Sequence, residues 1–401
     1  MFNVNKIRKD FPILDRRING KPIIYFDNSC MSLKPIQVID KMNEYYREYT
    51  ACGGRSQHKF GNKTTDEFEK SRDIIKKFLN AKRSSEIIFT RNTTEGINFI
   101  GNRFKFNKGD KVLATDKEHN SNLLIWQNLS KKGIIKHEIV NSNNDNTFNL
   151  DEYNKKIKGT RLVSMVHTSN LDGYTIPAKE IIKIAHENDA LVLLDCAQSL
   201  PHKLVDIRNL DVDFIAASGH KMLGPTGTGI LYGKEDLLEN MEPFNVGGET
   251  VIDSTYTNYT FEKLPHRFEA GLQDYAGMIG LGEAVRYLMN IDFEKHEYEL
   301  NKKLTEFLEK HNSIKIIGPK DPKLRGPIVN FIIDKISAHD VVTILDESSN
   351  IMIRSGAHCV HSWFNKHKLQ GSSRISLYFY NTIEEVDTFI ESFDKVIKIF
   401  K

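Results

Sequence analysis

The chain has 401 residues, 39% of them hydrophobic, which is enough to bury a large core, and this length predicts two or three domains. Its 56 lysines and arginines stand against 53 acidic residues, and the net charge of +3 is scattered, which argues against a nucleic-acid-binding or membrane-surface protein. The first residues lack the apolar segment of a signal peptide, and no later window approaches the roughly 20 apolar residues of a membrane-spanning helix, so we expect a cytoplasmic protein.

The first 233 residues alternate between short apolar runs and longer periodic segments. After a short helix and an extended lead-in, the pattern predicts strands at 23–26, 86–90, 111–115, 162–166, 191–194 and 213–217. It predicts helices at 35–49, 64–79, from residue 92, around residue 126 and at 177–188, with Thr64 and Glu67 as a capping box that opens the second. Strands that alternate with such helices form a largely parallel sheet with helices on both faces. We therefore predict a large α/β domain at residues 21–285.

The rest of the chain follows a different pattern. A long periodic stretch from Asp274 to about His311 predicts two helices. Strands are expected beyond it at 314–317, 328–333, 351–354 and 375–379, with helices that begin at Ser337 and Thr382. These elements, together with the start of the chain, predict a smaller α+β domain made of residues 1–20 and 286–401.

The four cysteines, Cys30, Cys52, Cys196 and Cys359, lie far apart and form no CxxC pair. In a chain of this length, such spacing argues against a disulfide framework or a zinc ribbon. We therefore expect free thiols.

The stretch from Leu191 to Gly229 carries the strongest chemical signal. The run Leu191–Leu194 is fully apolar and ends at Asp195, as expected of a central parallel strand whose last residue faces a crevice. The next apolar run leads to Lys221, in a loop that glycines keep open. Pyridoxal phosphate requires an amine that forms a Schiff base and a carboxylate that keeps its pyridine nitrogen protonated, and Lys221 and Asp195 fit these roles. An isolated aspartate and lysine would more often be a buried strand end and a solvated loop residue.

Three further segments follow predicted strands and could line the same site. Asp27-Asn28-Ser29-Cys30 could form one wall of it. Asn92-Thr93-Thr94-Glu95 is a capping sequence, so free N–H groups and two threonine hydroxyls would form a phosphate cradle at a helix N-terminus, although most capping boxes hold only their own helix. His119 lies at a strand's carboxyl end, where open α/β sheets bind ligands, and its ring could stack on a pyridine; most loop histidines are simply solvated.

A cysteine-containing loop lies between two arginines near the C-terminus. Arg354 precedes the loop and Arg374 follows it. A guanidinium binds a carboxylate through two parallel hydrogen bonds, so Arg374 is our candidate for an amino-acid α-carboxylate, with Arg354 in support; a structural ion pair is the alternative for each. We expect Cys359 to be an accessible thiol, with a pKa that is lowered by neighbouring positive charge. It could instead be a buried small hydrophobe, or bind a metal with His358 and His361, but no second cysteine or carboxylate lies at ligand spacing, and we expect no metal.

These motifs, taken together, resemble a known family. D-x-A-Q followed by S-G-H-K-x-x-G-P-x-G-x-G resembles the cofactor site of class V aminotransferases, which are fold type I pyridoxal-phosphate enzymes. The motifs R-x-G-x-H-C and R-x-S-x-x-x-Y-N-T, with R-x-T-T-E-G-I-N at 91–98 and R-F-E-A-G at 267–271, resemble the cysteine desulfurases of the branch that includes selenocysteine lyases. The resemblance runs from about residue 23 to the C-terminus. It implies a mainly parallel seven-stranded sheet between helices and a smaller α+β domain that carries the catalytic cysteine loop.

The resemblance also implies a role for each matching residue. The catalytic residues would be Lys221, Cys359 and His119, with Cys359 as the persulfide-forming nucleophile. The cofactor would be held by Thr93, Thr94, His119, Asp195, Gln198, Ser218, His220 and Lys221. The substrate would be bound by Asn170, Arg354, Arg374 and Arg55, the last from a glycine-containing loop. Similar proteins are homodimers in which loops of one subunit complete the other subunit's site.

Three positions depart from the family pattern. Gly54 stands where the family has a histidine, which removes a proton carrier or substrate contact. Leu272 stands where a threonine commonly donates to the partner subunit's phosphate, and leucine cannot donate a hydrogen bond. Cys196 replaces a glycine, a change expected to affect only packing. These departures concern substrate identity and phosphate binding across subunits more than the lysine chemistry.

We therefore expect a pyridoxal-phosphate-dependent cysteine desulfurase. It would convert L-cysteine to L-alanine and transfer the sulfur to Cys359, from which an acceptor protein would collect it for iron–sulfur cluster or other sulfur-requiring biosynthesis. The alternatives are a selenocysteine lyase or another class V aminotransferase or β-lyase on the same scaffold, and a non-enzymatic desulfurase-like scaffold weakened by Gly54 and Leu272.

Overall fold

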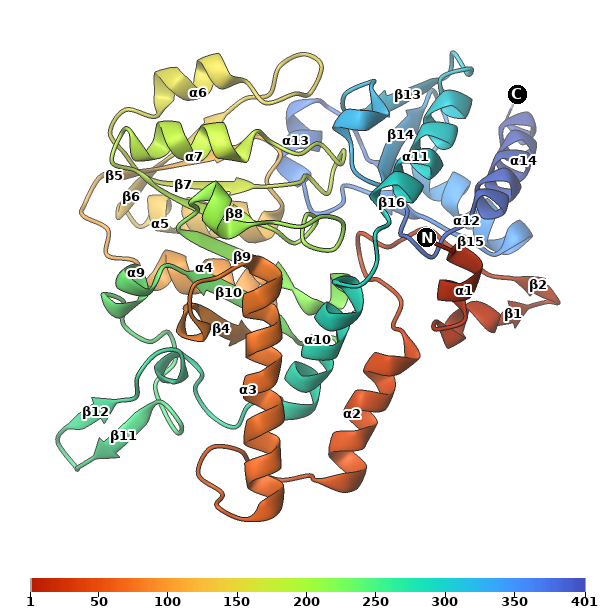
Figure 1. Ribbon diagram of the computed structural model, residues 1–401. Helices are drawn as coiled ribbons and strands as arrows, with labels where there is room; N and C mark the ends of the chain where they lie inside the picture. Colours follow the sequence, from red (N-terminus) through yellow and green to blue (C-terminus); the bar gives the residue numbers. More distant parts are fainter. Residues whose placement is uncertain (1, 401) are drawn as a thin grey trace.

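A seven-stranded sheet forms the centre of the larger part of the molecule, in the order β4-β10-β9-β8-β7-β5-β6 (Figure 1). The computed structural model describes residues 2–400. Strand β10 is antiparallel to both of its neighbours, and the other strands run in one direction, so the predicted mainly parallel seven-stranded sheet is confirmed. The strands are β4 (Ile87–Thr90), β5 (Asp110–Thr115), β6 (Ile135–Val140), β7 (Thr160–Val166), β8 (Leu191–Asp195), β9 (Phe214–Ser218) and β10 (Gly229–Gly233).

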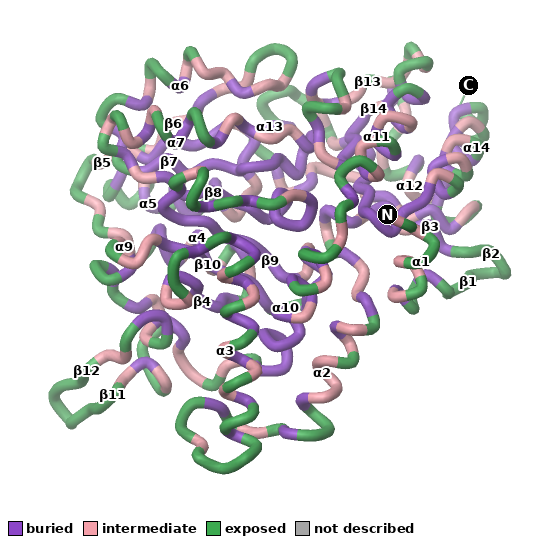
Figure 2. The backbone as a smooth tube through the Cα atoms, viewed as in Figure 1, coloured by how far each residue is buried: buried purple, intermediate pink, exposed green. Residues whose placement is uncertain are grey.

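Helices cover both faces of this sheet, and its central strands are coloured mostly as buried in Figure 2, whereas the outer strand β6 is largely not. In β8, Val192 and Leu194 enter a core with α3, α7 and α10, whereas Leu193 enters a second core with α4 and α5. Because successive side chains of a strand point to opposite faces, the uninterrupted apolar run of β8 requires helices on both. The helices of this part are α2 (Ile36–Glu48), α3 (Lys59–Leu79), α4 (Thr93–Arg103), α5 (Asn120–Lys131), α6 (Leu150–Lys156), α7 (Ala178–His186), α8 (Ile207–Leu210), α9 (Glu235–Glu239) and α10 (Tyr275–Leu288).

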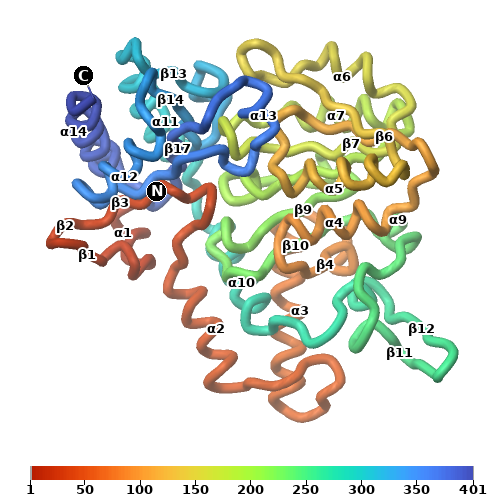
Figure 3. The backbone as a smooth tube through the Cα atoms, turned by 180° about the vertical axis from the view of Figure 1, so that it is seen from behind, coloured from red at the N-terminus to blue at the C-terminus, as the bar shows by residue number. Residues whose placement is uncertain are grey.

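A four-stranded antiparallel sheet of order β13-β14-β17-β16 forms the smaller part. Its own hydrophobic core includes Leu304, Phe331, Val341 and Phe389, which come from three helices and a strand. Seen from behind, the smaller part lies beside the large sheet, and α13 lies between the two (Figure 3). Its elements are α11 (Glu294–Leu308), β13 (Ile314–Ile317), β14 (Ile328–Ile333), α12 (Ala338–Ser349), β15 (Ile351–Met352), β16 (Arg354–Gly356), α13 (His361–Lys366), β17 (Ser372–Ser376) and α14 (Ile383–Ile399).

The N-terminal strand does not join the large sheet. Strand β3 (Ile24–Tyr25) pairs in parallel with β15, and both Ile24 and Phe26 are buried in the smaller core. These contacts favour assigning this strand to the smaller part, whereas the domain boundary at residue 21 remains a prediction. The other short elements are α1 (Val4–Arg8), β1 (Arg17–Ile18), β2 (Lys21–Pro22), β11 (Val251–Ser254), β12 (Tyr259–Phe261) and single 3-10 turns at Pro12–Asp15, Ser84–Glu86, Gly219–Lys221, His266–Phe268 and Pro322–Leu324.

Two predicted boundaries are wrong. The capping box at Thr64 does not open a helix, because α3 already begins at Lys59 with the side chain of His58 accepting from the Gly61 N–H. The Thr64 hydroxyl instead donates to the carbonyl of Tyr49 and to that of Phe60. The last strand ends at Ser376 and not at Phe379, because the chain then turns into the cap of α14.

A buried ion pair fixes the outer strand β4. Arg72 of α3 donates to both carboxylate oxygens of Glu269, over 2.7 and 2.9 Å, and Glu269 also accepts from the Phe89 N–H over 2.7 Å. The carboxylate in the R-F-E-A-G motif therefore joins α3 to β4, which is a structural role.

Among the described residues, no helix is both long and apolar enough to cross a membrane.

Candidate active site

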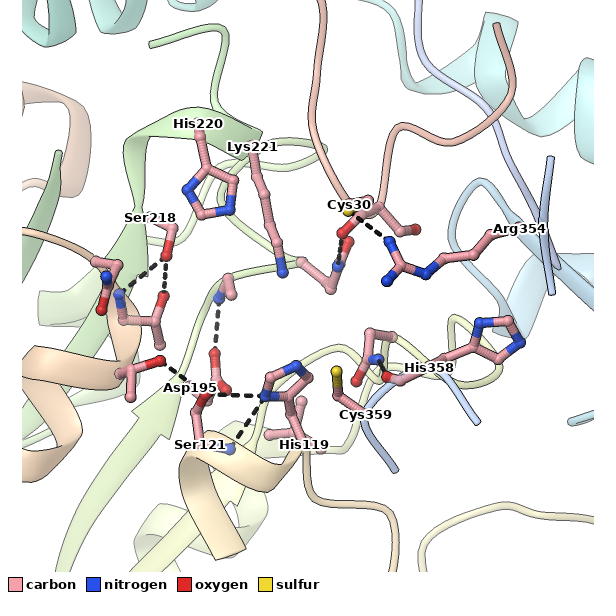
Figure 4. Close-up of a pocket in the computed structure, with 18 of the residues that line it drawn as sticks. Cys30, His119, Ser121, Asp195, Ser218, His220, Lys221, Arg354, His358 and Cys359 are labelled. Carbon is pink, nitrogen blue, oxygen red and sulfur yellow. Dashed lines mark hydrogen bonds between the residues drawn. The ribbon is translucent and has the colours of Figure 1, made fainter. Parts of the chain in front are cut away.

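One cavity gathers side chains from the carboxyl ends of the large sheet, from the segment around Cys30 and from the loop after β16 (Figure 4). All the expected site residues except Arg55 line it. They are Thr93, Thr94, His119, Asn170, Asp195, Gln198, Ser218, His220, Lys221, Arg354, Cys359 and Arg374. These residues are up to 281 positions apart in the sequence, from Thr93 to Arg374. Parallel strands bring their carboxyl ends to one edge of the large sheet, and the smaller part adds Arg354, Cys359 and Arg374.

Lys221 and Asp195 lie on neighbouring strands of the sheet. Asp195 is the last residue of β8, and Lys221 ends the turn that follows β9, the strand that pairs with β8. Burial lowers the pKa of the Lys221 amine, and the Asp195 carboxylate acts in the opposite direction. Burial also raises the pKa of Asp195, so this carboxylate gains from a cationic partner. A nucleophilic amine thus faces the same cavity as a buried acid that needs a positive charge.

His119 caps α5 next to this pair. Its Nδ1 accepts from the Ser121 backbone N–H over 3.1 Å, which assigns the ring proton of the neutral imidazole to Nε2. Burial, followed by the positive charge of Lys221, lowers the pKa of His119 to about 3. The ring is therefore neutral at ordinary pH, and a neutral flat ring can stack on another aromatic ring.

The N-terminus of α4 forms the polar end of the cavity. The Asn92 side chain accepts from the Glu95 N–H over 3.0 Å, which confirms the predicted cap. The Ser218 hydroxyl accepts from the Thr93 N–H over 2.9 Å and lies 2.6 Å from the Thr93 hydroxyl. Gly229 permits this close approach, because a Cβ there would lie 2.6 Å from the Asn92 Cα. Amide and hydroxyl donors at a helix N-terminus are a favourable environment for a phosphate.

Two residues that the sequence analysis missed fix the backbone next to Lys221. The His220 carbonyl accepts from the Ser32 N–H over 3.1 Å and from the Lys34 amine over 2.9 Å. The Ser32 hydroxyl accepts in turn from the Leu223 N–H over 2.9 Å. The turn that carries Lys221 is therefore held by a segment almost 190 residues earlier in the chain. No local motif reveals this contact.

Arg374 is buried in β17 and presents one edge to the cavity. Its Nη1 donates to the Asn170 carbonyl over 3.0 Å, and its Nη2 lies 3.4 Å from the carboxylate of Asp27. Its Nε is buried and has no partner among the described residues. Because Nε and Nη2 form the edge that binds a carboxylate through two parallel hydrogen bonds, this edge suits an α-carboxylate.

The loop that carries Cys359 is held at two carbonyl groups. Asn170 donates to the His358 carbonyl over 2.7 Å, and the Asn120 N–H donates to the Cys359 carbonyl over 2.8 Å. His358 and Cys359 have φ angles of 48° and 59°, a left-handed conformation that costs energy for residues other than glycine. The thiol lines the cavity and is partly exposed, so it is not the buried hydrophobe that the sequence left open.

The cysteine loop does not form a metal site among the described residues. The Nε2 of His358 lies 3.0 Å from the Ser372 hydroxyl, and His361 lies 3.0 Å from the Asn120 amide. Burial lowers the pKa of His358 to about 2, so this ring is neutral. The positive charges close to Cys359 come instead from Arg354 and Lys221.

A second thiol, which the sequence analysis did not select, lines the same cavity. Cys30 accepts a hydrogen bond from Arg354 Nη1, and Arg354 also lies 3.7 Å from Asp27. Figure 4 shows the Arg354 guanidinium directed at Cys30, with Cys359 on the other side of the cavity. The only sequence signal for Cys30 was its place in a run of small polar residues after a strand.

Arg55 lies outside the cavity. Its guanidinium is exposed, donates to the Val251 carbonyl over 2.8 Å and lies 3.9 Å from Glu249, near the β11–β12 hairpin. Gly54 lies next to it, and Leu272 is 73% exposed. Within one chain, the structure therefore does not bring Arg55 to the other expected substrate contacts.

The cavity suits pyridoxal phosphate. The Gln198 Oε1 and the Ser29 hydroxyl are buried and have no partner among the described residues, so polar groups remain for a ligand. Lys221 supplies the amine, Asp195 the acid for a protonated ring nitrogen, His119 a flat neutral ring, and Thr93, Thr94, Ser218 and His220 line the phosphate end. This donor set is what the cofactor requires.

Comparison with known proteins gives consistent matches along the chain. The model of the class-V aminotransferase family matches residues 24–389. The chain is 38% identical to a probable cysteine desulfurase of Halalkalibacterium halodurans over 99% of both proteins, and 40% identical to one of Synechocystis sp. over 98% of this chain and 96% of that protein. Among solved structures, a cysteine desulfurase of Thermococcus onnurineus superposes with a TM-score of 0.95 at 37% identity, over 99% of both chains. The cysteine desulfurase CsdA of Escherichia coli superposes with a TM-score of 0.91 at 29% identity, over 100% of this chain and 99% of that chain.

Proposed function

Since the chain belongs to the class-V aminotransferase family and fits its cysteine desulfurase branch, we propose that it converts L-cysteine to L-alanine and transfers the sulfur to Cys359. Enzymes of this family depend on pyridoxal phosphate. The observation that carries the proposal is the position of Cys359, whose thiol lines the cavity that also holds Lys221 and Arg374. An amine, a carboxylate-binding edge and a second nucleophile within one cavity are what desulfuration of an amino acid requires.

The large sheet holds and activates the cofactor. When bound, pyridoxal phosphate supplies an electron sink for the substrate Cα. Lys221 would hold the cofactor, and its Nζ would move the Cα proton, a task that its lowered pKa favours because more of the amine is neutral. Asp195 would pair with the ring nitrogen, Gln198 would bind the ring hydroxyl, and the donors at the start of α4 would bind the phosphate.

The thiol end binds the substrate and receives the sulfur. Arg374 Nε and Nη2 bind the α-carboxylate, which directs the substrate side chain toward the cysteine loop. The Cys359 thiolate attacks the substrate sulfur, so an S–S bond forms while the C–S bond breaks and its electron pair stays with the substrate carbon. The product on the enzyme is a persulfide, and the carbon skeleton leaves as alanine after protonation.

The same proposal includes partners and location. A sulfur-acceptor protein would collect the persulfide from the partly exposed Cys359 loop and pass it to iron–sulfur cluster or other sulfur-requiring synthesis. A homodimer would bring Arg55, Gly54 and Leu272, which lie outside their own chain's cavity, toward the partner subunit's site; the exposed apolar residues around the β11–β12 hairpin, Val246, Ile252 and Tyr259, support such a contact. The four free cysteines suit the reducing cytoplasm.

The Cys359→Ala variant tests this function. We expect alanine formation from L-cysteine to fall by about 10²-fold or more, because the sulfur loses its acceptor. Mass mapping of the wild-type protein after incubation with L-cysteine should place added sulfur on the peptide that contains Cys359.

The matched control is Cys52→Ala, which removes an exposed thiol outside the cavity and should leave alanine formation unchanged. Unchanged sulfur release by Cys359→Ala would contradict the assignment. Activity on selenocysteine alone that survives the substitution would instead support a selenocysteine lyase.

A further inference from the structure

Arg354 has an unusual partner at the carboxylate end of the cavity. Its Nη1 is directed at the Cys30 sulfur and donates to it, whereas the nearest carboxylate oxygen, Oδ2 of Asp27, is 3.7 Å away. The Arg354 side chain is 38% exposed, so it is not held in place by packing. A long, half-exposed side chain loses its orientation when its hydrogen-bond partner is removed. Cys30 is therefore the contact that fixes this guanidinium.

Asp27 cannot form a close ion pair with both arginines of the site. Its Oδ1 lies 3.4 Å from Arg374 and its Oδ2 lies 3.7 Å from Arg354, so a single carboxylate is divided between two guanidinium groups. Two formal positive charges against one negative charge leave one positive charge, which matches a substrate carboxylate. A carboxylate in place of Cys30 would cancel this excess.

Unpartnered polar groups indicate that a ligand completes this end of the cavity. The Ser29 hydroxyl, which precedes Cys30, is buried without a partner among the described residues, and so are Oδ1 of Asn170 and Nε of Arg374. All three residues line the same cavity or its wall together with Cys30. The position of Cys30 is thus part of a surface that is prepared for a polar ligand.

We propose that Cys30 positions Arg354 for the α-carboxylate of the amino-acid substrate. Sulfur is a weaker acceptor than a carboxylate oxygen and takes only one N–H of Arg354, so Cys30 orients the guanidinium before and after binding and leaves its other N–H groups for a carboxylate that enters beside Arg374. Cys30 is a positioning residue in this role, because it acts through Arg354 and takes no sulfur itself. The inference rests on the proposed function, which supplies the amino-acid substrate.

Three substitutions at position 30 separate this role from others. Cys30→Ala removes the acceptor, so the Arg354 guanidinium is no longer oriented for the substrate carboxylate. The KM for L-cysteine should rise about 5-fold with little change in kcat. Cys30→Ser keeps an acceptor of similar size and should restore the KM to within about 2-fold of the wild-type value. Cys30→Asp should raise the KM about 30-fold or more, because a carboxylate traps the guanidinium and cancels the excess charge.

Ligands with and without a carboxylate provide the decisive measurement. The dissociation constants of L-alanine and of cysteamine, which lacks the carboxylate, are measured with the holoenzyme from the change in cofactor absorbance. Cys30→Ala should weaken the binding of L-alanine and leave that of cysteamine unchanged. Cys52→Ala, the exposed-thiol control, should change neither.

Several outcomes would overturn the inference. They are an unchanged or lower KM in Cys30→Ala, an equal loss of L-alanine and cysteamine binding, a serine variant that behaves like the alanine variant, or sulfur from the substrate that accumulates on Cys30. Failure of the proposed function is distinguishable, because the wild-type enzyme would then form no alanine from L-cysteine, whereas L-alanine binding could still be measured in every variant.

Discussion

The two ends of the cavity are built in different ways. At the cofactor end, Asp195, Ser218 and Lys221 come from the ends of two adjacent strands of one sheet and from the turn that follows. At the thiol end, Arg354 and Cys359 belong to the smaller part, and Cys30 comes from a segment 324 residues earlier than its partner Arg354. One end is thus a single rigid framework, and the other is an assembly of separate segments.

Burial and backbone conformation follow the same division. Lys221 and Asp195 are enclosed by the sheet and its helices, whereas Arg354 is half-exposed and Cys359 lies in a loop with two consecutive left-handed residues. Groups that must stay aligned with a cofactor gain from a rigid framework. A thiol that must meet the substrate and then present sulfur to an acceptor gains from a loop that can move.

Removal of the amine at the cofactor end should have the largest effect. In Lys221→Ala we expect loss of the absorbance of the lysine-bound cofactor and a fall in alanine formation of about 10⁴-fold, at the upper end of what a general acid–base group contributes. Lys203→Met is the matched control, because this amine donates to Thr175 outside the cavity. A Lys221→Ala enzyme that kept both the absorbance and the activity would contradict the assigned role.

A conservative change at the thiol end should affect binding rather than chemistry. In Arg374→Lys the charge remains but the bidentate edge is lost, so we expect the KM for L-cysteine to rise about 10- to 100-fold, which is the range for a lost pair of charge-assisted hydrogen bonds. Steady-state kinetics and L-alanine titration measure the effect. If kcat fell and the KM stayed constant, Arg374 would not be the carboxylate ligand.

A histidine at each end of the cavity should make the stability depend on pH, and this should be the smallest of the expected effects. Burial lowers the pKa of His119 to about 3 and that of His358 to about 2, whereas the unfolded chain takes up these protons near pH 6.5. Because the unfolded state then binds more protons, the free energy of unfolding is retained above pH 6.5 and falls as the pH is lowered, by about 1.4 kcal/mol per pH unit for each histidine.

Urea denaturation of the wild type and of His358→Gln at pH 7.5, 6.5 and 5.5 measures this dependence. The variant should lose about 1.0 kcal/mol less than the wild type between pH 6.5 and 5.5, because the unfolded histidine is already half protonated at pH 6.5. Identical pH dependence in the two proteins would show that His358 already takes up its proton in the folded state. The same comparison with His119→Gln tests the cofactor end.

Local pattern was enough to predict most of the large sheet and the cofactor end. The apolar run before Asp195, the glycine-containing loop of Lys221 and the cap at Asn92 are each complete within about ten residues, so the sequence alone shows both the element and the side chain at its end. The alternation of strands with helices also predicted helices on both faces of the sheet.

Tertiary structure alone decided the contacts between distant segments. Four such contacts have no periodic signature in the sequence. Strand β3 pairs with β15, Ser32 supports the turn of Lys221, Asn170 donates to the cysteine loop, and Arg354 donates to Cys30. Likewise, the sequence placed Arg55 among the substrate contacts, but the fold of one chain leaves it beside Glu249. The physical reason is that periodicity and capping report how a segment is bonded to itself and which face it buries. Hydrogen bonds between segments hundreds of residues apart depend on packing, which only the complete fold specifies.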